Sequence, residues 1–293
     1  MSIFLDRNTR VIVSGITGNE GKFWTEHMIA LGTKVVCGVT PGKEGMTACG
    51  VPVYHSVRRA LAHHEVDAAM LFVPPRFTKD AVYEMIDHEI KKIVTIADGI
   101  PVHEAAQIRA LSLARNAMVI GGNTSGVITP GEAMMGAFPF WIKRVYQQGD
   151  IGVMTRSGSL TNEVTAMIVS AGFGVSSLVG VGGDSVPCTR FVEILSLFQE
   201  DKNTVAVVMI GELGGSMEEE VALAIEEQRF TKPMVAFIGG RTAPEGKRMG
   251  HAGAIISGGK GSVGDKVEAL ENAGVAVADR PSAVGRLLSE ILI

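Results

Sequence analysis

Apolar positions in the first part of the chain follow two spacings in turn, that of a β-strand and that of an amphipathic helix. The expected strands are residues 10–14, 34–38, 68–73, 92–96 and 118–121, and the expected helices between them are residues 21–31, 57–62, 78–89 and 105–114. Strands that are joined by helices of this length pair in parallel. The pattern therefore predicts a doubly wound, Rossmann-like α/β domain over residues 1–125.

The alternation stops over residues 126–149, where prolines and glycines interrupt both spacings, and we expect a connection there. It then resumes. The expected strands are residues 151–155, 176–181, 205–210, 234–238 and 275–278, and the expected helices are residues 160–171, 191–198, 218–227, 263–273 and 283–292. This second run predicts a flavodoxin-like parallel-sheet domain over residues 150–293.

Composition narrows the class of protein. The 293 residues suffice for two domains, each with its own core. The formal net charge is -4, so the chain lacks the basic surface that nucleic-acid binding needs. The chain starts without the apolar core of a signal peptide and has no apolar run of membrane-spanning length, so we expect a cytoplasmic protein with no membrane contact. Three cysteines without a CxxC pair argue against disulfides and against a cysteine metal site.

Glycine is enriched, with 36 residues, and one glycine cluster stands where a phosphate could bind. Gly15-Ile-Thr-Gly18-Asn-Glu-Gly21 follows the first expected strand and opens the first helix, where backbone amides can face an anion. An NAD site also needs an acidic residue after the second strand, and Lys43 stands there instead. A base favours a ligand with an extra phosphate near its ribose, such as NADP or coenzyme A (CoA). A turn without a ligand, beside a solvated lysine, is the alternative.

One histidine differs from the others in its surroundings. His251 lies between Gly250 and Gly253 in a loop after an expected strand and after the polar turn 242–247, which leaves its imidazole open to act as a nucleophile. The other six histidines, His27, His55, His63, His64, His88 and His103, are expected to be surface or hydrogen-bonded residues.

Two further turns end strands of the same domain, at the edge where parallel sheets bind ligands. Ser157 and Gly158 open a helix and offer a hydroxyl and amides to an anion. Glu212 follows another strand and could accept an N–H from His251, although a helix-capping role is the alternative. A histidine, an orienting carboxylate and an anion site together suggest phosphoryl transfer through a phosphohistidine.

At this point several motifs resemble one family. They are Val39-Thr-Pro-Gly-Lys43, Gly126-Val-Ile-Thr-Pro-Gly131, Arg156-Ser-Gly158, Val181-Gly-Gly-Asp184, Met209-Ile-Gly-Glu212 and Lys247-Arg-Met-Gly-His-Ala-Gly-Ala-Ile-Ile256. They are similar to the α subunit of succinate-CoA ligase (succinyl-CoA synthetase), essentially from end to end. The resemblance implies a CoA-binding domain, a domain with an active histidine, and an ATP-grasp β subunit that holds ATP or GTP with Mg²⁺ in an αβ or α2β2 assembly.

The resemblance also implies roles for particular residues. His251 would carry the phosphate, Glu212 would orient it, and Ser157 with Gly158 would surround the phosphate. The residues implied at the CoA site are Thr17, Gly18, Asn19, Glu20, Lys43, Ala97, Asp98 and Gly99.

This sequence departs from the family pattern in several places. The family usually has serine and glutamine at Asn19 and Glu20, threonine and glutamate at Ala97 and Asp98, and a proline-asparagine-cysteine-proline run at residues 122–125. Asn162 stands where a tyrosine near the acyl substrate is usual, and in this it is similar to the citrate-CoA ligase and ATP-citrate lyase group.

The expected function is that of the α subunit of an acid-CoA ligase that forms ADP or GDP. Its expected acid is succinate, as in the tricarboxylic acid cycle, with citrate or malate as alternatives because Asn162 opens room and adds hydrogen-bond donors. A CoA-binding regulator without catalysis remains a different possibility. A nicotinamide oxidoreductase is disfavoured by Lys43.

Overall fold

The computed structural model describes residues 2–241, 250–255 and 261–292, and the chain divides into two compact units. The N-terminal unit comprises residues 4–138 and 186–189. The C-terminal unit comprises residues 1–3, 139–185 and 190–293. The domain limits at residues 125 and 150 remain a prediction. No helix among the described residues is long and apolar enough to cross a membrane.

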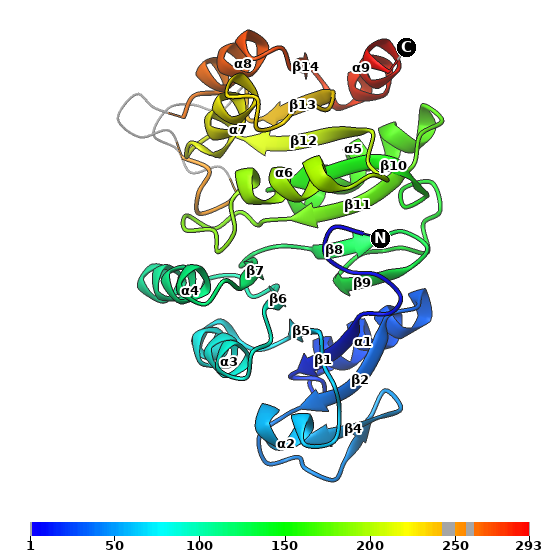
Figure 1. Ribbon diagram of the computed structural model, residues 1–293, viewed down its shortest axis with the longest axis vertical. Helices are drawn as coiled ribbons and strands as arrows, with labels where there is room; N and C mark the ends of the chain where they lie inside the picture. The colour runs from blue at the N-terminus through cyan, green and yellow to red at the C-terminus, as the bar shows by residue number, and fades with distance from the viewer. Residues whose placement is uncertain (1, 242–249, 256–260, 293) are drawn as a thin grey trace. The chain divides into compact units, whose positions relative to one another are not determined.

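The N-terminal unit is built on one twisted sheet whose strands are drawn in Figure 1. In spatial order the strands are β3 (Thr47–Ala48), β4 (Val51–Tyr54), β2 (Lys34–Val39), β1 (Arg10–Ser14), β5 (Ala68–Leu71), β6 (Lys92–Thr95) and β7 (Met118–Ile120). All neighbours pair in parallel except the edge pair β3–β4. Its helices are α1 (Asn19–Leu31), α2 (Val57–Leu61), α3 (Pro75–Asp87) and α4 (Val102–Ala114). The predicted α/β fold with parallel crossovers is confirmed here.

The sequence pattern missed four short strands. β4 contains Pro52, which removes a backbone donor, and β3 has only two residues, so neither gives a recognisable period. Two more strands, β8 (Gly126–Thr129) and β9 (Ala133–Gly136), form an antiparallel hairpin inside the segment expected as a connection. Every residue of both strands is buried, so the alternation that marks a half-exposed strand is absent.

The C-terminal unit has a parallel sheet covered by helices. Its strands, in spatial order, are β14 (Ala276–Ala278), β13 (Met234–Gly239), β12 (Ala206–Glu212), β10 (Gln148–Thr155) and β11 (Val175–Gly180). The helices are α5 (Gly158–Ser170), α6 (Phe191–Glu200), α7 (Met217–Glu226), α8 (Val263–Asn272) and α9 (Val284–Ile291), with a short 3-10 turn at Pro281–Ala283.

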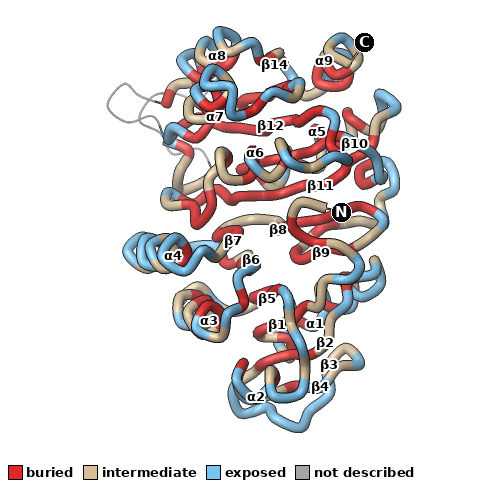
Figure 2. Tube along the Cα trace, viewed as in Figure 1, coloured by how far each residue is buried: buried red, intermediate tan, exposed pale blue. Residues whose placement is uncertain are grey.

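Figure 2 shows the inner strands of this sheet in the colour of buried residues, in agreement with the fully buried β11 and β12. Strands that are covered on both faces read as continuous apolar runs, as the sequence does here. The second α/β domain expected from the sequence is therefore confirmed. The polar turn expected over residues 242–247 lies outside the described residues.

Candidate active site

The carboxyl ends of two neighbouring strands of the C-terminal unit bring Arg156 and Glu212 to one edge of the sheet. β10 and β12 pair in register, with Thr155 opposite Ile210, and the amide of Arg156 donates to the carbonyl of Ile210 at 3.1 Å. Residues that follow the two strands therefore emerge side by side, as expected at the ligand-binding edge of a parallel sheet.

His251 reaches this edge from the loop after β13. Its Nδ1 lies 2.8 Å from Oε2 of Glu212. The flat face of the ring lies against Gly183, where an added Cβ would be 2.5 Å from His251 Cγ, and the amide of Gly253 donates to the Gly183 carbonyl at 3.0 Å. The structure thus brings the predicted histidine and carboxylate together, and the capping role considered for Glu212 is not what its side chain does.

The surroundings of His251 raise its pKa above the ordinary value of 6.5. The main cause is the hydrogen bond with Glu212, and the charges of Glu212 and Asp184 add to it. Partial burial and the nearby Arg156 guanidinium act in the opposite direction. With Nδ1–H donated to Glu212, the tautomer is fixed and the lone pair that can act as a nucleophile is on Nε2.

The start of α5, directly after Arg156, is a candidate anion site. Ser157 caps the helix, and its Oγ accepts from the Leu160 amide at 3.5 Å. Thr161 Oγ1 donates to the Ser157 carbonyl and lies 2.9 Å from Thr155 Oγ1, which fixes the turn from β10 into the helix. The first-turn amides of Gly158 and Ser159 have no acceptor within a helix, so they are suited to an anion.

The N-terminal unit has a cleft of about 640 Å³ at the carboxyl ends of β1, β2 and β5. Thr17 and Gly18, two of the residues predicted at the CoA site, line it. Gly15 and Gly21 must be glycines because other backbone atoms approach them closely. A Cβ on Gly15 would lie 2.2 Å from the Phe72 carbonyl oxygen, and a Cβ on Gly21 would lie 2.2 Å from the Gly15 carbonyl oxygen. A long cleft with glycine amides at a helix start fits a phosphate-bearing ligand such as CoA.

The other residues predicted at the CoA site are placed differently. Asn19 and Glu20 are exposed in the first turn of α1, and the Glu20 carboxylate accepts from Trp24 Nε1 at 3.1 Å. Lys43 is exposed, just beyond the Thr40 and Pro41 residues that line the cleft.

The turn at residues 97–99 follows the next strand, β6, and does not line this cleft. Ala97 is buried, Asp98 and Gly99 are exposed, and the Ala97 carbonyl accepts the amide of Asn123 at 2.8 Å.

The folded chain adds residues to both sites for which the sequence indicated no role. Phe72, Pro74 and Phe77 line the CoA-type cleft, and Gly183 and Asp184 lie at His251. Phe72 and Pro74 come directly after a buried strand that the sheet order places next to β1. The position after that strand is the signal that could have found them.

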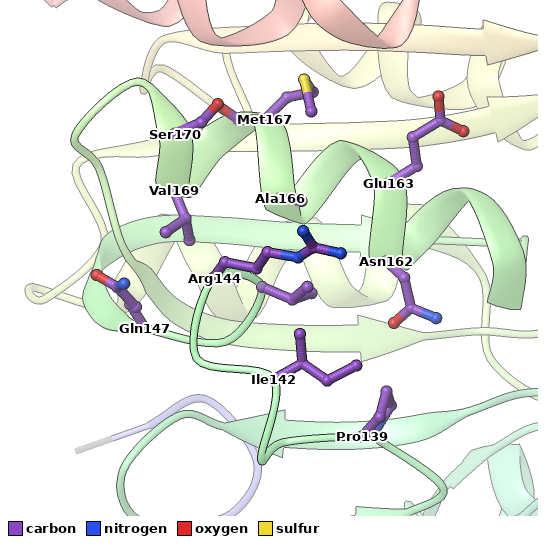
Figure 3. A pocket seen from close by; sticks show the side chains of 11 residues that line it. Pro139, Ile142, Arg144, Gln147, Asn162, Glu163, Ala166, Met167, Val169 and Ser170 are labelled. Atoms are coloured by element: carbon purple, nitrogen blue, oxygen red, sulfur yellow. The ribbon is translucent and has the colours of Figure 1, made fainter.

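Asn162 lies one turn into α5 and lines a cavity of about 590 Å³ between this helix and residues 139–147. Figure 3 shows Asn162 and Arg144 directed into this space. The buried Tyr146 donates its hydroxyl proton to Oδ1 of Asn162, and burial raises the pKa of this phenol, which keeps it protonated. The amide nitrogen of Asn162 is therefore the donor that this residue can offer to a ligand in the cavity.

The chain matches two family models, one described as a CoA binding domain over residues 6–99 and one described as CoA-ligase over residues 154–276. It is 69% identical over 291 residues to the ADP-forming sulfoacetate-CoA ligase subunit SqwL of Acholeplasma sp, covering 99% of this chain and 98% of that protein. It is 65% identical over 292 residues to the ADP-forming sulfoacetate-CoA ligase subunit SauD of Bilophila wadsworthia, covering all of both chains.

A more distant relative is the succinate-CoA ligase [ADP-forming] subunit alpha 2 of Archaeoglobus fulgidus, 47% identical over 292 residues and covered in full. The fold is similar to that of the ATP citrate lyase of Methanosaeta concilii, with a TM-score of 0.89 and 24% identity over 98% of this chain. This chain spans half of that longer one. By its sequence and its two matched regions, the chain belongs to the family of α-type subunits of ADP-forming acid-CoA ligases.

Proposed function

We propose that this chain carries the phosphohistidine of a ligase that joins sulfoacetate to CoA and forms ADP, together with an ATP-grasp β subunit that binds the nucleotide with Mg²⁺. Sulfoacetate replaces succinate as the expected acid. The observation that carries the proposal is the 2.8 Å contact between His251 Nδ1 and Glu212, because it fixes the orientation of the ring and the tautomer in which Nε2 is the nucleophile.

The proposed role of His251 is to hold a phosphoryl group between two reactions. Its Nε2 forms a bond to the terminal phosphorus of ATP while the bond to the ADP oxygen breaks. A carboxylate oxygen of the acid then takes the phosphoryl group, which breaks the Nε2–P bond and restores neutral imidazole. CoA supplies the thiol that accepts the acyl group, with release of phosphate.

Glu212 and the start of α5 support these steps in different ways. Glu212 holds the Nδ1 proton and stabilises positive charge on the ring as the Nε2–P bond forms. The amides of Gly158 and Ser159 and the helix dipole offset the charge of a phosphate without a counter-ion. Thr17 and Gly18 are proposed to bind a phosphate of CoA.

The proposal of sulfoacetate rests on two independent supports. The relatives at 69% and 65% identity bear that substrate in their names, whereas a succinate ligase subunit is 47% identical. A sulfonate also has three acceptor oxygens and one permanent negative charge, which suits a cavity with the oriented Asn162 amide and the Arg144 guanidinium.

A label-and-chase experiment tests the proposal. The chain is purified with its partner, loaded from ATP labelled at the terminal phosphate, and chased with CoA and one acid: sulfoacetate, succinate, citrate or malate. We expect acid-labile, base-stable label on this chain and its loss with sulfoacetate. His251→Asn should abolish the label, while His103→Asn, a control at an exposed histidine, should keep it.

Each other outcome contradicts part of the proposal. Loss of label with succinate but not with sulfoacetate would overturn the substrate. The absence of label in the wild-type complex would overturn the phosphohistidine and favour a CoA-binding regulator.

A substitution at the proposed acid site gives a sharper test of the substrate. Asn162→Asp keeps the acceptor for Tyr146 but replaces the amide donor by a carboxylate oxygen, which repels an anionic acid. We expect the KM for sulfoacetate to rise by about ten- to a hundredfold, because a hydrogen bond to a charged group contributes about 1.5–3 kcal/mol, while labelling of His251 stays unchanged. An unchanged KM would exclude Asn162 from the acid site.

A further inference from the structure

A buried cluster of charged side chains lies directly behind Glu212. Glu218, in the first turn of α7, and Lys266, on α8, are both fully buried at 0% exposure, and the Arg156 side chain is 3% exposed. Buried charges are costly unless each is paired. Nothing in the proposed reaction uses Glu218 or Lys266, so their burial next to the site needs another explanation.

Glu218 contacts both Glu212 and the cation beside it. Its Oε1 accepts the backbone amide of Glu212 at 3.2 Å and lies 3.4 Å from Nη1 of Arg156. Gly211 makes room for this side chain, since a Cβ there would lie 2.7 Å from Glu218 Cγ. Position 211, directly before Glu212, must be glycine because the Glu218 side chain packs over it.

Lys266 is the counter-charge that makes a buried Glu218 tolerable. Its ammonium group donates three hydrogen bonds: to Glu218 Oε2 at 2.6 Å, to Glu219 Oε2 at 2.7 Å and to the Gly215 carbonyl at 3.0 Å. These use all three of its donors. Glu219 is 29% exposed and does not contact Arg156 or Glu212 in the described part of the chain.

The distance between Arg156 and Glu212 affects how much negative charge Glu212 presents to His251. The Nε of Arg156 lies 3.6 Å from Glu212 Oε1, and neither atom has a hydrogen-bond partner among the described residues. The guanidinium is instead held by the Gly214 carbonyl at 2.9 Å and by Glu218. The two groups form an ion pair without a hydrogen bond. A small shift of the guanidinium would add the hydrogen bond and withdraw more negative charge from His251.

We infer, resting on the proposed function, that Glu218 is a positioning residue for the His251–Glu212 pair. It fixes the Glu212 backbone and keeps the Arg156 guanidinium from closing to hydrogen-bond distance of the Glu212 carboxylate. Lys266 balances its charge. Together with Glu212, Arg156 and Asp184, which face His251 from the ends of β12, β10 and β11, these residues decide how much negative charge the imidazole experiences.

The test compares Glu218→Gln with Glu219→Gln. The control substitution, at the next residue, also removes one negative charge and one carboxylate that contacts Lys266. The histidine titration is followed by NMR on the full chain, and the phosphorylation rate is measured with ATP in the complex with the partner. We expect Glu218→Gln to lower the pKa of His251 and to slow phosphorylation by about tenfold, as for supporting hydrogen-bond partners of other ligating histidines. The KM for ATP of the Glu218→Gln variant should stay unchanged. In the Glu219→Gln variant, the pKa of His251 and the phosphorylation rate should both equal those of the wild type.

The double variant Glu218→Gln with Lys266→Gln covers loss of folding in the single variant, since it leaves neither buried charge unpaired. It should fold and show the same lowered pKa of His251. Equal titration curves for the Glu218 and Glu219 variants, or a normal curve in the double variant, would overturn the inference. A wild-type complex without label would instead overturn the proposed function, while the titration would still report on Glu218.

Discussion

At the scale of single residues, His251 is distinguished by what surrounds it on every side. Glu212 holds one nitrogen at 2.8 Å, Gly183 lies under the ring, and Asp184 and Arg156 act on its charge in opposite directions. The imidazole is thus restrained in orientation and in tautomer, which a reversible phosphate carrier requires. Two predictions belong to this scale.

The first prediction concerns pH. Nε2 accepts a phosphoryl group only when it is unprotonated, and the pKa of His251 is raised, so the phosphorylation rate should increase as pH rises through that pKa. Glu212→Gln removes the main cause of the shift. The acid limb of the rate profile should then move to lower pH, with a lower maximum rate because the charge that stabilises the ring is gone. Rates of label uptake from pH 5 to 9 check this, and an unmoved limb would contradict it.

The second prediction concerns space. Gly183→Ala places a methyl group 2.5 Å from His251 Cγ, so the ring must move. We expect phosphorylation to fall by about a hundredfold, the usual effect of an ångström-scale displacement in a reacting group. Gly264→Ala is a matched control on α8, where the nearest atom to the new Cβ is 3.7 Å away. Similar rates in the two variants would show that the ring does not depend on Gly183.

At the scale of elements, the site depends on the order of strands and on the start of one helix. β10 and β12 are neighbours in the sheet although α5, β11 and α6 separate them along the chain, and this adjacency places Arg156 beside Glu212. The turn from β10 into α5 then puts the first helical amides at the same edge.

A pair of cap variants separates stability from anion binding. Ser157 caps α5 and Ser262 caps α8, each accepting a backbone amide three residues on. Both serine-to-alanine substitutions should lower the free energy of unfolding by about 1 kcal/mol. Only Ser157→Ala should also slow phosphorylation of His251. Denaturant unfolding and label uptake measure the two effects, and equal labelling would place the anion elsewhere.

At the scale of the whole molecule, two units carry different parts of the proposed function. The CoA-type cleft is built in the N-terminal unit, and the His251–Glu212 pair is built in the C-terminal unit. Substitutions in the cleft should therefore change CoA affinity without changing phosphorylation of His251.

Lys43 provides the test at this scale. If its ammonium group binds the extra phosphate of CoA, Lys43→Ala should weaken CoA binding by about 1 kcal/mol, the upper range for an exposed ion pair, and leave dephospho-CoA binding unchanged. Lys34→Ala, at the opposite end of the strand β2, is the matched control. Calorimetric titration with both ligands decides it, and an equal loss for both ligands would exclude the phosphate contact.

The sequence by itself determined the two α/β regions and the glycine loop, and it indicated His251 and Glu212 as candidate site residues. These follow from local signals: apolar period, turn residues and an imidazole between glycines are properties of short segments. Glu212 was found because the carboxyl end of a parallel strand is a place that sequence can indicate without coordinates.

Only the tertiary structure decided the rest. The β8–β9 hairpin gave no pattern because it is buried on both faces, and the contact of Gly183 with His251 joins residues far apart in the chain. Glu218 and Lys266 look like ordinary charges of amphipathic helices until α7 and α8 pack and remove both from water. Burial and pairing depend on which surfaces meet, and no spacing within a single segment records that.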